Sequence, residues 1–546
     1  MDFRTFLLFG EVIVYFFFMV LIGLITKKWV SNISDFFISG REVSWLPIGL
    51  GLAAIMFSGA TLPAISGLAI THGLWVGSLY MWGWAAGIII FGVWGKSFGP
   101  AIRRSGVYTL PEWAQIRYDE RTRTVVAVAT SIAAFGALFA QVVGLGVNLS
   151  ALTGIPYWGT TLIITVLCTF YMYAGGFWAL SISDMAHMVV IMIALTASVI
   201  YLIATYGSPV DVFSSIEGAD WRVFSFLGKL DFSLRFPSVW SLLFGWVLTM
   251  FGAQYYWMRA VGARSEKEVK KGYLLSGVIT FLFGSTLLAG FGLYAIHIFG
   301  DGNFNPGSAF GLIVRILPLG LDGFLLVAMT AAAMSTFSTA LIGVSSPLLR
   351  DVYQRFLKPN ATSEELVLPS RIITLAVAVI AWVTALLWKE SAALALAALW
   401  AFSVPTAVIL ILGHYYNRIT SKAAFWGVAI GVVATIFWYF APGNLAQYAH
   451  AMWVAFFVTL IVTLVVTFTS KPKYYGAEDF KPKEPSKAEG IAQTAVSAFQ
   501  TEEHKKAMQE LMKPAIGTKK WKKIIEDKHN DSKSISQILF PNLIEQ

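Results

Sequence analysis

Apolar stretches of about 20 residues recur along the chain from Phe6 to roughly Thr469, separated by short polar segments. A stretch of this length is what an α-helix needs to cross the hydrocarbon core of a bilayer. The pattern therefore predicts an all-α, polytopic membrane domain over residues 1–470. We count about thirteen spans, centred near residues 16, 57, 85, 137, 166, 195, 249, 286, 336, 378, 403, 431 and 459.

Two predicted spans are interrupted by small, polar or helix-breaking residues: Ser58, Gly59, Thr61 and Pro63 in the second, and Gly245, Gly252 and Gln254 in the seventh. At membrane depth, irregular backbone is tolerated only around a cavity or a site. If the first span is peripheral, the interrupted helices begin two successive five-helix groups. This is the arrangement of inverted-repeat transporters, which bind solute and ions at their broken helices. The alternative is that glycine and proline merely allow kinks or close packing.

Hydroxyl side chains cluster in the stretch A A A M S T F S T A L I G, at Ser335, Thr336, Ser338 and Thr339. Helical spacing places them along one edge of the ninth span. Together with carbonyl groups freed by a broken helix, they supply the hard oxygen ligands that suit an alkali cation. The alternative is that they bond back to the preceding turn or join neighbouring helices.

A carboxylate lies at the start of the sixth span, in W A L S I S D M A H. Further into the bilayer such a group costs about 2.5–3.5 kcal/mol, so Asp184 needs a cationic partner or an aqueous path. Capping of a helix start, helped by Ser181 and Ser183, is the alternative. His187, one turn later, is either a proton-titrating group or a hydrogen-bonded packing residue.

The composition agrees with a membrane protein, because 57% of residues are hydrophobic, only 13% are charged, and the mean hydropathy is +0.67. So few charges cannot cover a soluble protein of this kind. The single cysteine, Cys168, has no partner for a disulfide. Residues 471–546 form a polar, basic tail that supplies much of the net charge of +9, so the charge does not indicate a nucleic-acid partner.

Lysine and arginine are concentrated in alternate loops, at residues 27–41, 96–123, 259–271, 350–358 and 418–422. By the positive-inside rule these loops are cytoplasmic. The expected topology in the cell membrane has the N-terminus outside and the tail inside. The tail segment K K W K K I I E D K has the composition of a segment that contacts an anionic membrane surface or a partner, and a solvated extension is the alternative.

Four motifs together resemble the sodium:solute symporter family, and the likeness covers nearly all of residues 1–470. They are D F F I S G R E V S W L, V Y T L P E W A Q I R Y, G G F W A L S I S D M A H, and A A A M S T F S T A L I G V S S P L L R D V Y. The third departs from the family pattern, with His187 where the family has glutamine. The resemblance implies a leucine-transporter-type fold of two inverted five-helix repeats with discontinuous first and sixth core helices, and alternating access.

The resemblance also implies ion ligands. The principal sodium site would use the carbonyl groups of Ala54, Phe57 and Ala332 and the hydroxyl groups of Ser335 and Thr336. A further sodium site, present in only some members, would use Asp184, Ser338 and Thr339, with Ser335 as a candidate shared ligand.

The sequence defines the solute less precisely than the ion ligands. Sugar-transporting members carry an acid and amides on the broken first helix and an asparagine on the sixth, whereas this chain has Ala60, Thr61 and Ala253, so a hexose is disfavoured. We expect a small neutral, zwitterionic or monocarboxylate solute, because no lysine or arginine is expected among the mid-span cavity candidates. These candidates are Ser58, Gly59, Thr61, Gln141, Gln254, Tyr255, Tyr256, Trp400 and Ser403.

The predicted function is secondary active uptake of this solute, driven by inward movement of sodium. One alternative is the same architecture driven by protons, with Asp184 and His187 as the titrating pair. Another is a membrane sensor in which the transporter-like part regulates the tail. An enzyme is not expected, because no metal-ligand cluster or nucleophile–base pair recurs in the spans.

Overall fold

The computed structural model describes residues 3–215, 230–300, 304–387, 392–441, 443 and 445–471. Within these residues every regular element is a helix, and the strand-like contact is an isolated parallel bridge between Val43 and Ala263. The prediction of an all-α protein is confirmed. From residue 472 onward, the predicted tail lies outside the described residues.

The N-terminal helices are α1 (Phe3–Thr26), α2 (Ile33–Ile38), α3 (Trp45–Met56), α4 (Thr61–His72), α5 (Leu74–Gly92), α6 (Phe98–Ser105), α7 (Leu110–Arg117), α8 (Glu120–Thr153), α9 (Tyr157–Tyr206) and α10 (Pro209–Ser215). The later helices are α12 (Val239–Gly252), α13 (Gln254–Val261), α14 (Glu266–Ile279), α15 (Ser285–Phe299), α16 (Ala309–Ile316), α17 (Leu321–Pro347), α18 (Val367–Leu387), α19 (Ala392–Tyr415), α20 (Ser421–Phe440) and α21 (Ala451–Thr469). Short 3₁₀ turns are η1 (Lys27–Trp29), η2 (Ser39–Arg41), η4 (Pro306–Ser308) and η6 (Leu445–Gln447), and π-helical segments are η3 (Thr280–Gly284) and η5 (Leu348–Leu357).

Polar residues set several helix starts. Asp119 accepts a hydrogen bond from the Thr122 amide at 2.8 Å at the start of α8. Thr109 accepts one from the Glu112 amide at 3.2 Å at the start of α7. Each side chain satisfies an amide that has no partner within its own helix, which is the usual role of an N-cap.

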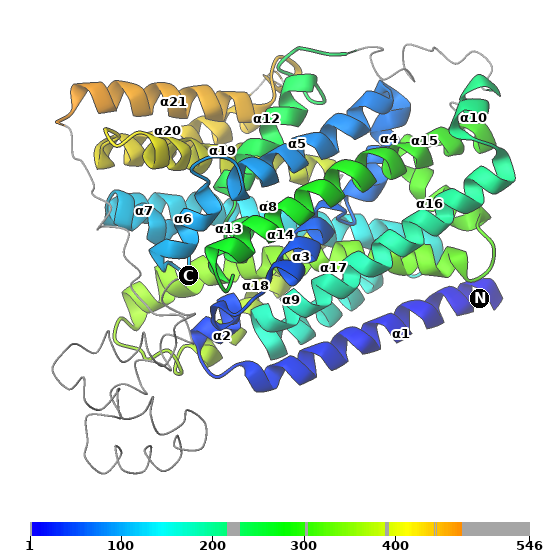
Figure 1. Cartoon of the computed structure of the whole chain (residues 1–546), viewed down its shortest axis with the longest axis horizontal. Helices are drawn as coiled ribbons and strands as arrows, with labels where there is room; N and C mark the ends of the chain where they lie inside the picture. Colours follow the sequence, from blue (N-terminus) through cyan, green and yellow to red (C-terminus); the bar gives the residue numbers. More distant parts are fainter. Residues whose placement is uncertain are drawn as a thin grey trace, which may run out of the picture.

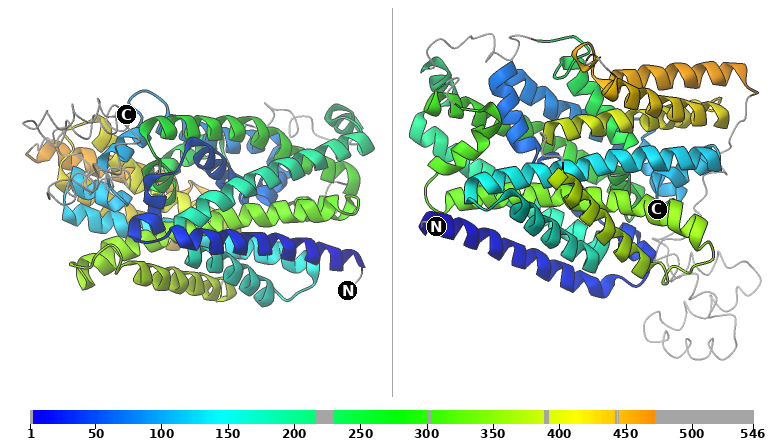
Figure 2. Two further views of the ribbon diagram at one scale, coloured as in Figure 1. Left: turned by 60° about the horizontal axis from the view of Figure 1, so that its bottom comes forward. Right: turned by 180° about the vertical axis from the view of Figure 1, so that it is seen from behind.

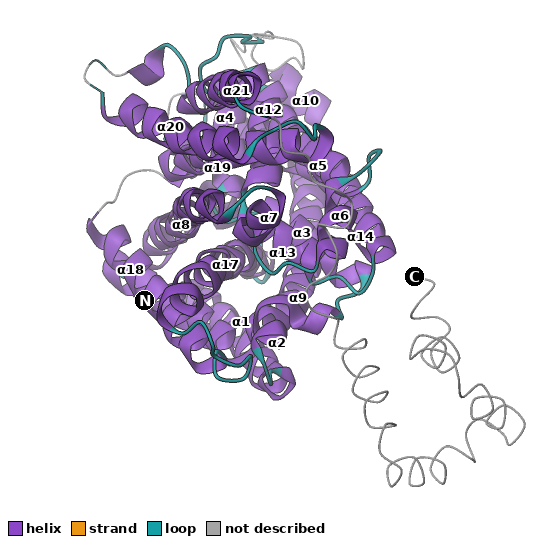
Figure 3. Cartoon of the chain, turned by 90° about the vertical axis from the view of Figure 1, so that its left-hand side faces the viewer, coloured by secondary structure: helices purple, strands orange, loops and turns teal. Residues whose placement is uncertain are grey.

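The helices form an elongated bundle in which many run close to the long axis (Figures 1 and 2). Seen end-on, α17 lies in the middle of the bundle (Figure 3), where it packs against α1, α3, α8, α9 and α18. Every residue of this helix from position 325 to 347 is buried. α1 lies at the outer edge and packs against α9 and α17. The hydroxyl-rich helix is therefore the centre of the molecule.

Nine helices among the described residues are long and apolar enough to cross a membrane, or ten when the bent pair α3 and α4 is counted as one span. The number is lower than thirteen partly because α9 contains the fifth and sixth predicted spans. Gly176 separates these two parts with φ 53° and ψ −137°, which is not helical. A side chain there would overlap the Phe36 carbonyl, so the kink requires glycine. The count of thirteen stays a prediction.

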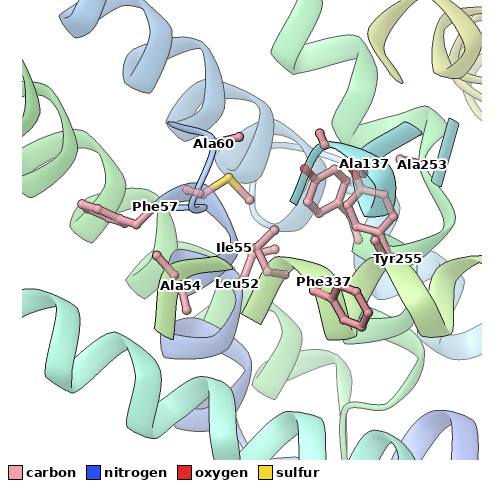
Figure 4. Close-up of a cluster of buried hydrophobic side chains, with 14 of the residues drawn as sticks. Leu52, Ala54, Ile55, Phe57, Ala60, Ala137, Ala253, Tyr255 and Phe337 are labelled. Atoms are coloured by element: carbon pink, nitrogen blue, oxygen red, sulfur yellow. The ribbon is translucent and has the colours of Figure 1, made fainter. Parts of the chain in front are cut away.

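Both helices that the sequence marked as interrupted are interrupted. α3 ends at Met56, α4 begins at Thr61, and the two are bent by 48°. α12 ends at Gly252 and α13 begins at Gln254, because Ala253 between them is extended. Residues at both breaks belong to one buried cluster, drawn in Figure 4.

The basic loop segments come together at one end of the bundle. Arg103 donates to the carbonyl of Ala263 at 2.5 Å, Arg123 donates to the carbonyl of Arg350 at 3.2 Å, and Arg117 donates to the carbonyl of Ile419 at 3.4 Å. The N-terminus lies at the opposite end (Figure 1). Loops predicted to be on the same side of the membrane are thus in contact with one another.

Candidate functional site

The break in α3 leaves carbonyl groups without helical partners. An α-helix satisfies each carbonyl with the amide four residues ahead, and this ladder stops at the end of α3. The amide of Phe57 still donates to the carbonyl of Ala53, but four residues separate Met56 from the start of α4. Figure 4 shows Ala54 and Phe57 beside this irregular stretch.

Hydroxyl groups of α17 take the place of the missing amides. The Ser335 hydroxyl donates to the Ala54 carbonyl at 3.1 Å and lies 2.9 Å from the Ala332 carbonyl. The Thr336 hydroxyl lies 3.2 Å from the Ile55 carbonyl and 3.3 Å from that of Ala332. These distances are those of hydrogen bonds, and two oxygen atoms that share a cation at about 2.4 Å lie at a similar separation of roughly 3–3.5 Å.

Small residues bring the two helices close enough for these contacts. A Cβ added at Gly59 would overlap the Cβ of Ala333, so the break rests directly on the A A A segment of α17. Ser335 is fully buried and Thr336 is 5% exposed. Four of the five residues predicted for the principal sodium site are joined by these hydrogen bonds, and the fifth, Phe57, follows the end of α3.

The residues predicted for a further sodium site have different partners. Asp184 forms an ion pair with Arg259, and the Thr339 hydroxyl lies 3.5 Å from the same carboxylate oxygen. The Ser338 hydroxyl is hydrogen-bonded instead to the Tyr171 hydroxyl. Asp184 and Thr339 are therefore brought together, while Ser338 has a separate partner.

Arg259 is a site residue that the sequence analysis missed, because it was grouped with the loop charges after the seventh span. In the structure it belongs to α13 and is 1% exposed. The requirement that Asp184 have a cationic partner was the signal that pointed to such a residue. No feature of the linear sequence identified Arg259 as the partner of Asp184.

The candidate solute residues near the first break interact mainly with one another. The hydroxyl groups of Ser58 and Thr61 are 2.8 Å apart, and the Thr61 amide donates to the Ser58 hydroxyl at 3.1 Å. Gly59 faces Ala333, as described above. These contacts fix the shape of the stretch between α3 and α4.

At the second break, Gln254 is directed to the start of α7. Its side-chain oxygen accepts from the Leu110 amide at 2.6 Å, and its nitrogen lies 3.3 Å from the Ser346 hydroxyl. The rings of the next two residues, Tyr255 and Tyr256, contact each other with centroids 4.3 Å apart. Gln254 thus connects α13, α7 and α17 at the end of the bundle that carries the basic loops.

The remaining solute candidates lie on α8 and α19. Gln141 is fully buried, and neither atom of its amide has a hydrogen-bond partner among the described residues. The Ser403 hydroxyl donates to the Thr249 hydroxyl at 3.2 Å. Trp400 belongs to α19, but its side chain lies outside the described residues.

An aromatic cluster between α5 and the two halves of the second broken helix joins the candidate Tyr256 to three residues that the sequence analysis missed. Trp84 stacks on Trp246 with ring centroids 3.7 Å apart, Tyr80 contacts Trp246 at 4.8 Å, and Trp84 contacts Tyr256 at 5.3 Å. All four side chains are buried. Aromatic residues are common in membrane helices, so spacing alone did not distinguish these from interface residues.

An ion-pair network joins α7 to α8 and to η5, the segment that follows α17. Glu112 pairs with Arg350 at 2.8 Å and lies 3.6 Å from Arg123, and Arg123 pairs with Asp351 at 2.5 Å. Burial by itself would raise the pKa of the Glu112 carboxyl, but Arg350 and Arg123 outweigh it, so the pKa lies below the ordinary value. Glu112 is therefore ionised at neutral pH.

The sequence profile of the Sodium:solute symporter family matches residues 36–431, more than half of the chain. The chain belongs to this family. Among its relatives, the high-affinity proline transporter PutP of Bacillus subtilis (strain 168) is 26% identical over 482 residues, covering 85% of this symporter and 98% of the relative. The sodium/pantothenate symporter of Escherichia coli (strain K12) is also 26% identical, covering 73% and 83% of the two chains. The sodium/glucose cotransporter of Vibrio parahaemolyticus is 24% identical, covering 81% and 86%.

Solved structures show the same fold. A Na⁺-coupled sialic acid symporter, in a substrate-bound outward-open state, matches with a TM-score of 0.76 at 18% identity, covering 87% of this symporter and all of the other chain. MHP1, a nucleobase-cation-symport-1 family transporter in a closed conformation, matches with a TM-score of 0.51 at 16% identity, covering 82% and 97%. The symporter is thus a membrane transport protein, its coupling ion is sodium, and its relatives are transporters rather than enzymes.

Proposed function

We propose that this symporter is a secondary active transporter of the plasma membrane that couples inward sodium movement to uptake of a small organic solute. The observation that carries the proposal is the bridge from Ser335 and Thr336 to the carbonyl groups of Ala54 and Ile55 at the break in α3. A cation bound there would join the broken helix to the central helix. Family membership and sodium coupling support the same conclusion.

The proposed topology has about thirteen spans and two inverted five-helix repeats, which begin with α3–α4 and α12–α13. The two breaks support it, because discontinuous helices in corresponding positions are the mark of such repeats. We place the N-terminus outside and the basic tail inside. The contacts among the basic loop segments at one end of the bundle support this orientation.

In the proposed cycle, sodium binds to the carbonyl groups of Ala54, Phe57 and Ala332 and the hydroxyl groups of Ser335 and Thr336. The ion holds α3 against α17 while the molecule is open to the outside and favours solute binding beside the break. When the molecule opens inward, α3 and α17 separate, the oxygen atoms spread apart, and the ion leaves. Sodium drives the change because it binds one arrangement better than the other.

The proposed solute is small and neutral, zwitterionic or a monocarboxylate, with a hexose disfavoured. Arg259 contacts two of the predicted ion ligands, Asp184 and Thr339, and its charge is already neutralised by Asp184. A dianion would therefore lack a counter-charge. The buried rings of Tyr80, Trp84 and Trp246 beside the second broken helix suit an apolar body, and the unpaired amide of Gln141 suits a polar group.

The test uses purified full-length protein and a panel of amino acids, monocarboxylates, vitamins and polyols, each added with sodium chloride or choline chloride. A solute of the proposed class should raise the melting temperature only when sodium is present. That solute should then enter proteoliposomes under an inward sodium gradient at equal pH on both sides. Uptake at the same rate in choline would contradict sodium coupling through this site.

A further inference from the structure

The ion pair between Asp184 and Arg259 lies where four helices meet. Asp184 is fully buried on α9, and Arg259 is 1% exposed on α13. The same guanidinium group donates to the Thr339 hydroxyl on α17 at 3.2 Å. The positive charge of Arg259 is thus held by two of the three residues that the family resemblance assigns to a further sodium ion.

Gly51 and Phe177 enclose two sides of the guanidinium group, whose Nε and Nη1 atoms have no hydrogen-bond partner among the described residues. A Cβ added at Gly51 of α3 would lie 2.8 Å from Nη1 of Arg259, so glycine leaves the room that this group occupies. The ring of Phe177 on α9 covers another side, with its centroid 5.3 Å from Cζ. Arginine can fill such an enclosure permanently, because its planar charged group tolerates stacking on an aromatic face.

The charges of this cluster balance without an added ion. One carboxylate, that of Asp184, pairs with one guanidinium group, that of Arg259, so the two buried charges cancel. A sodium ion bound to the remaining oxygen of Asp184 would leave an uncompensated positive charge in a fully buried place, at a cost of several kcal/mol. Ser338, the third predicted ligand, is hydrogen-bonded to Tyr171 instead.

We propose that the Arg259 side chain is the resident cation of the further sodium site, so that the protein binds one sodium ion per transport cycle. This inference rests on the proposed sodium-coupled function and adds its stoichiometry. Sodium binds at the principal site, where the ligands are carbonyl and hydroxyl groups. Arg259 neutralises Asp184 and stays with the protein through the cycle.

The stoichiometry determines how steeply the protein can concentrate its solute. One charge moved across 100 mV supplies about a fifty-fold accumulation, and two would supply roughly two-thousand-fold, before the sodium gradient itself is counted. Because Arg259 occupies the further site, the electrical driving force is that of one charge per cycle rather than two. Each transport cycle then moves one positive charge fewer across the membrane than a cycle that uses two sodium ions.

The experiment measures equilibrium binding of radiolabelled sodium to the purified full-length protein, with choline chloride holding the ionic strength constant. We expect one ion per chain and a hyperbolic isotherm for the unmodified protein. Two ions per chain would overturn the inference and leave sodium-coupled transport intact. No specific binding would instead contradict the proposed function, so the two failures are distinguishable.

Variants test the role of Arg259. Arg259→Gln leaves Asp184 unpaired beside Thr339, and we expect it to bind two ions. Adding Ser335→Ala in the same chain should raise the half-saturating sodium concentration of one of them about tenfold. An unchanged count of one in a folded Arg259→Gln protein would contradict the inference.

The neutral double variant Asp184→Asn with Arg259→Gln covers the case in which Arg259→Gln does not fold, because it leaves no buried charge unpaired. We expect this variant to bind one ion with a half-saturating sodium concentration within about threefold of the unmodified protein. Loss of that ion, or a tenfold weaker affinity, would show that Asp184 is a sodium ligand and would overturn the inference.

Discussion

At the scale of single residues, the partner of a hydroxyl group decides whether it is placed to hold an ion. Ser335 and Ser345 are both fully buried serines of α17. Ser335 reaches the Ala54 carbonyl on another helix, whereas Ser345 donates to the carbonyl of Leu341 one turn back in its own helix at 2.7 Å. Two chemically equal side chains on one helix thus have different expected roles.

Ser335→Ala should raise the sodium concentration needed for half-maximal uptake by about tenfold, because one ion ligand worth roughly 1.4 kcal/mol is lost. Ser345→Ala is the matched control and should change it by less than about twofold. The measurement is the sodium dependence of initial uptake into proteoliposomes. Equal effects of the two substitutions would show that the site is assigned to the wrong hydroxyl groups.

Gly59→Ala should destabilise the protein by about 1–3 kcal/mol, because the added methyl group overlaps Ala333 and forces the break away from α17. The same substitution at Gly290 on α15 is the control, since a Cβ there meets no atom within 4 Å. Thermal melting of the purified proteins measures both. A Gly59→Ala protein as stable as Gly290→Ala would mean that the close packing is not required.

At the scale of elements, α7 is a short helix whose position depends on side chains from its neighbours. Gln254 of α13 accepts from its first amide, and Arg350, just beyond α17, pairs with Glu112. The first contact joins α7 to α13, and the second joins α7 to η5, which follows α17. We therefore expect α7 to move together with α13 and α17.

Glu112→Gln should lower stability by about 2 kcal/mol at neutral pH, because it removes a charge-assisted bond to Arg350. The pKa of Glu112 is lower in the folded than in the unfolded protein, so this stabilisation is present above the ordinary value of 4.5 and is lost as pH falls through the folded pKa. The difference in melting temperature between the two proteins should stay constant from pH 8 to about 5.5 and shrink below pH 4.5.

The control for this prediction is Glu120→Gln. Glu120 pairs with Arg355 at 2.9 Å, but its side chain is 62% exposed. Solvent screening makes such a pair worth less than about 1 kcal/mol. A Glu120 variant that loses as much stability as the Glu112 variant would contradict the distinction between the two pairs.

At the scale of the whole molecule, α17 connects the parts that must move with respect to one another. It contacts both broken helices and also α8, α9 and α18. An ion that joins α3 to α17 therefore restrains the bundle at its centre. Binding of the ion should be visible as a change in the stability of the entire described domain.

Replacing sodium with choline should lower the melting temperature of the purified protein. At a sodium concentration 100-fold above the dissociation constant, the expected stabilisation is about 2.7 kcal/mol. Ser335→Ala, which weakens sodium binding about tenfold, should reduce this stabilisation to about 1.4 kcal/mol, while Ser345→Ala should keep it. A melting temperature that is independent of sodium in the unmodified protein would refute a site that binds the ion tightly in this arrangement.

Several features were predictable because they depend on local sequence. The breaks near Ser58 and Gly252 follow from small and polar residues inside apolar stretches. The start of α7 at Thr109 follows from capping chemistry. The hydroxyl edge of α17 follows from helical spacing. Each of these signals lies within a few residues of the structure that it predicts.

Other features required the packing of distant segments. Arg259 follows Asp184 by 75 positions, and positive charge near a helix end usually marks a loop. Trp84 and Trp246 are further apart in sequence, and their rings stack only because α5 lies against α12. The sequence also did not predict that α9 is one long helix, because a kinked helix and two separate spans have the same hydropathy pattern.

The sequence by itself determined that this is an all-α membrane protein, that two of its helices are broken, and which family it belongs to. These properties depend on hydropathy, on backbone preference and on short motifs, all of which are local. Only the tertiary structure decided which hydroxyl groups meet the freed carbonyl groups and which charge neutralises Asp184. Those outcomes depend on how closely helices approach, and that is set by contacts between residues far apart in the chain.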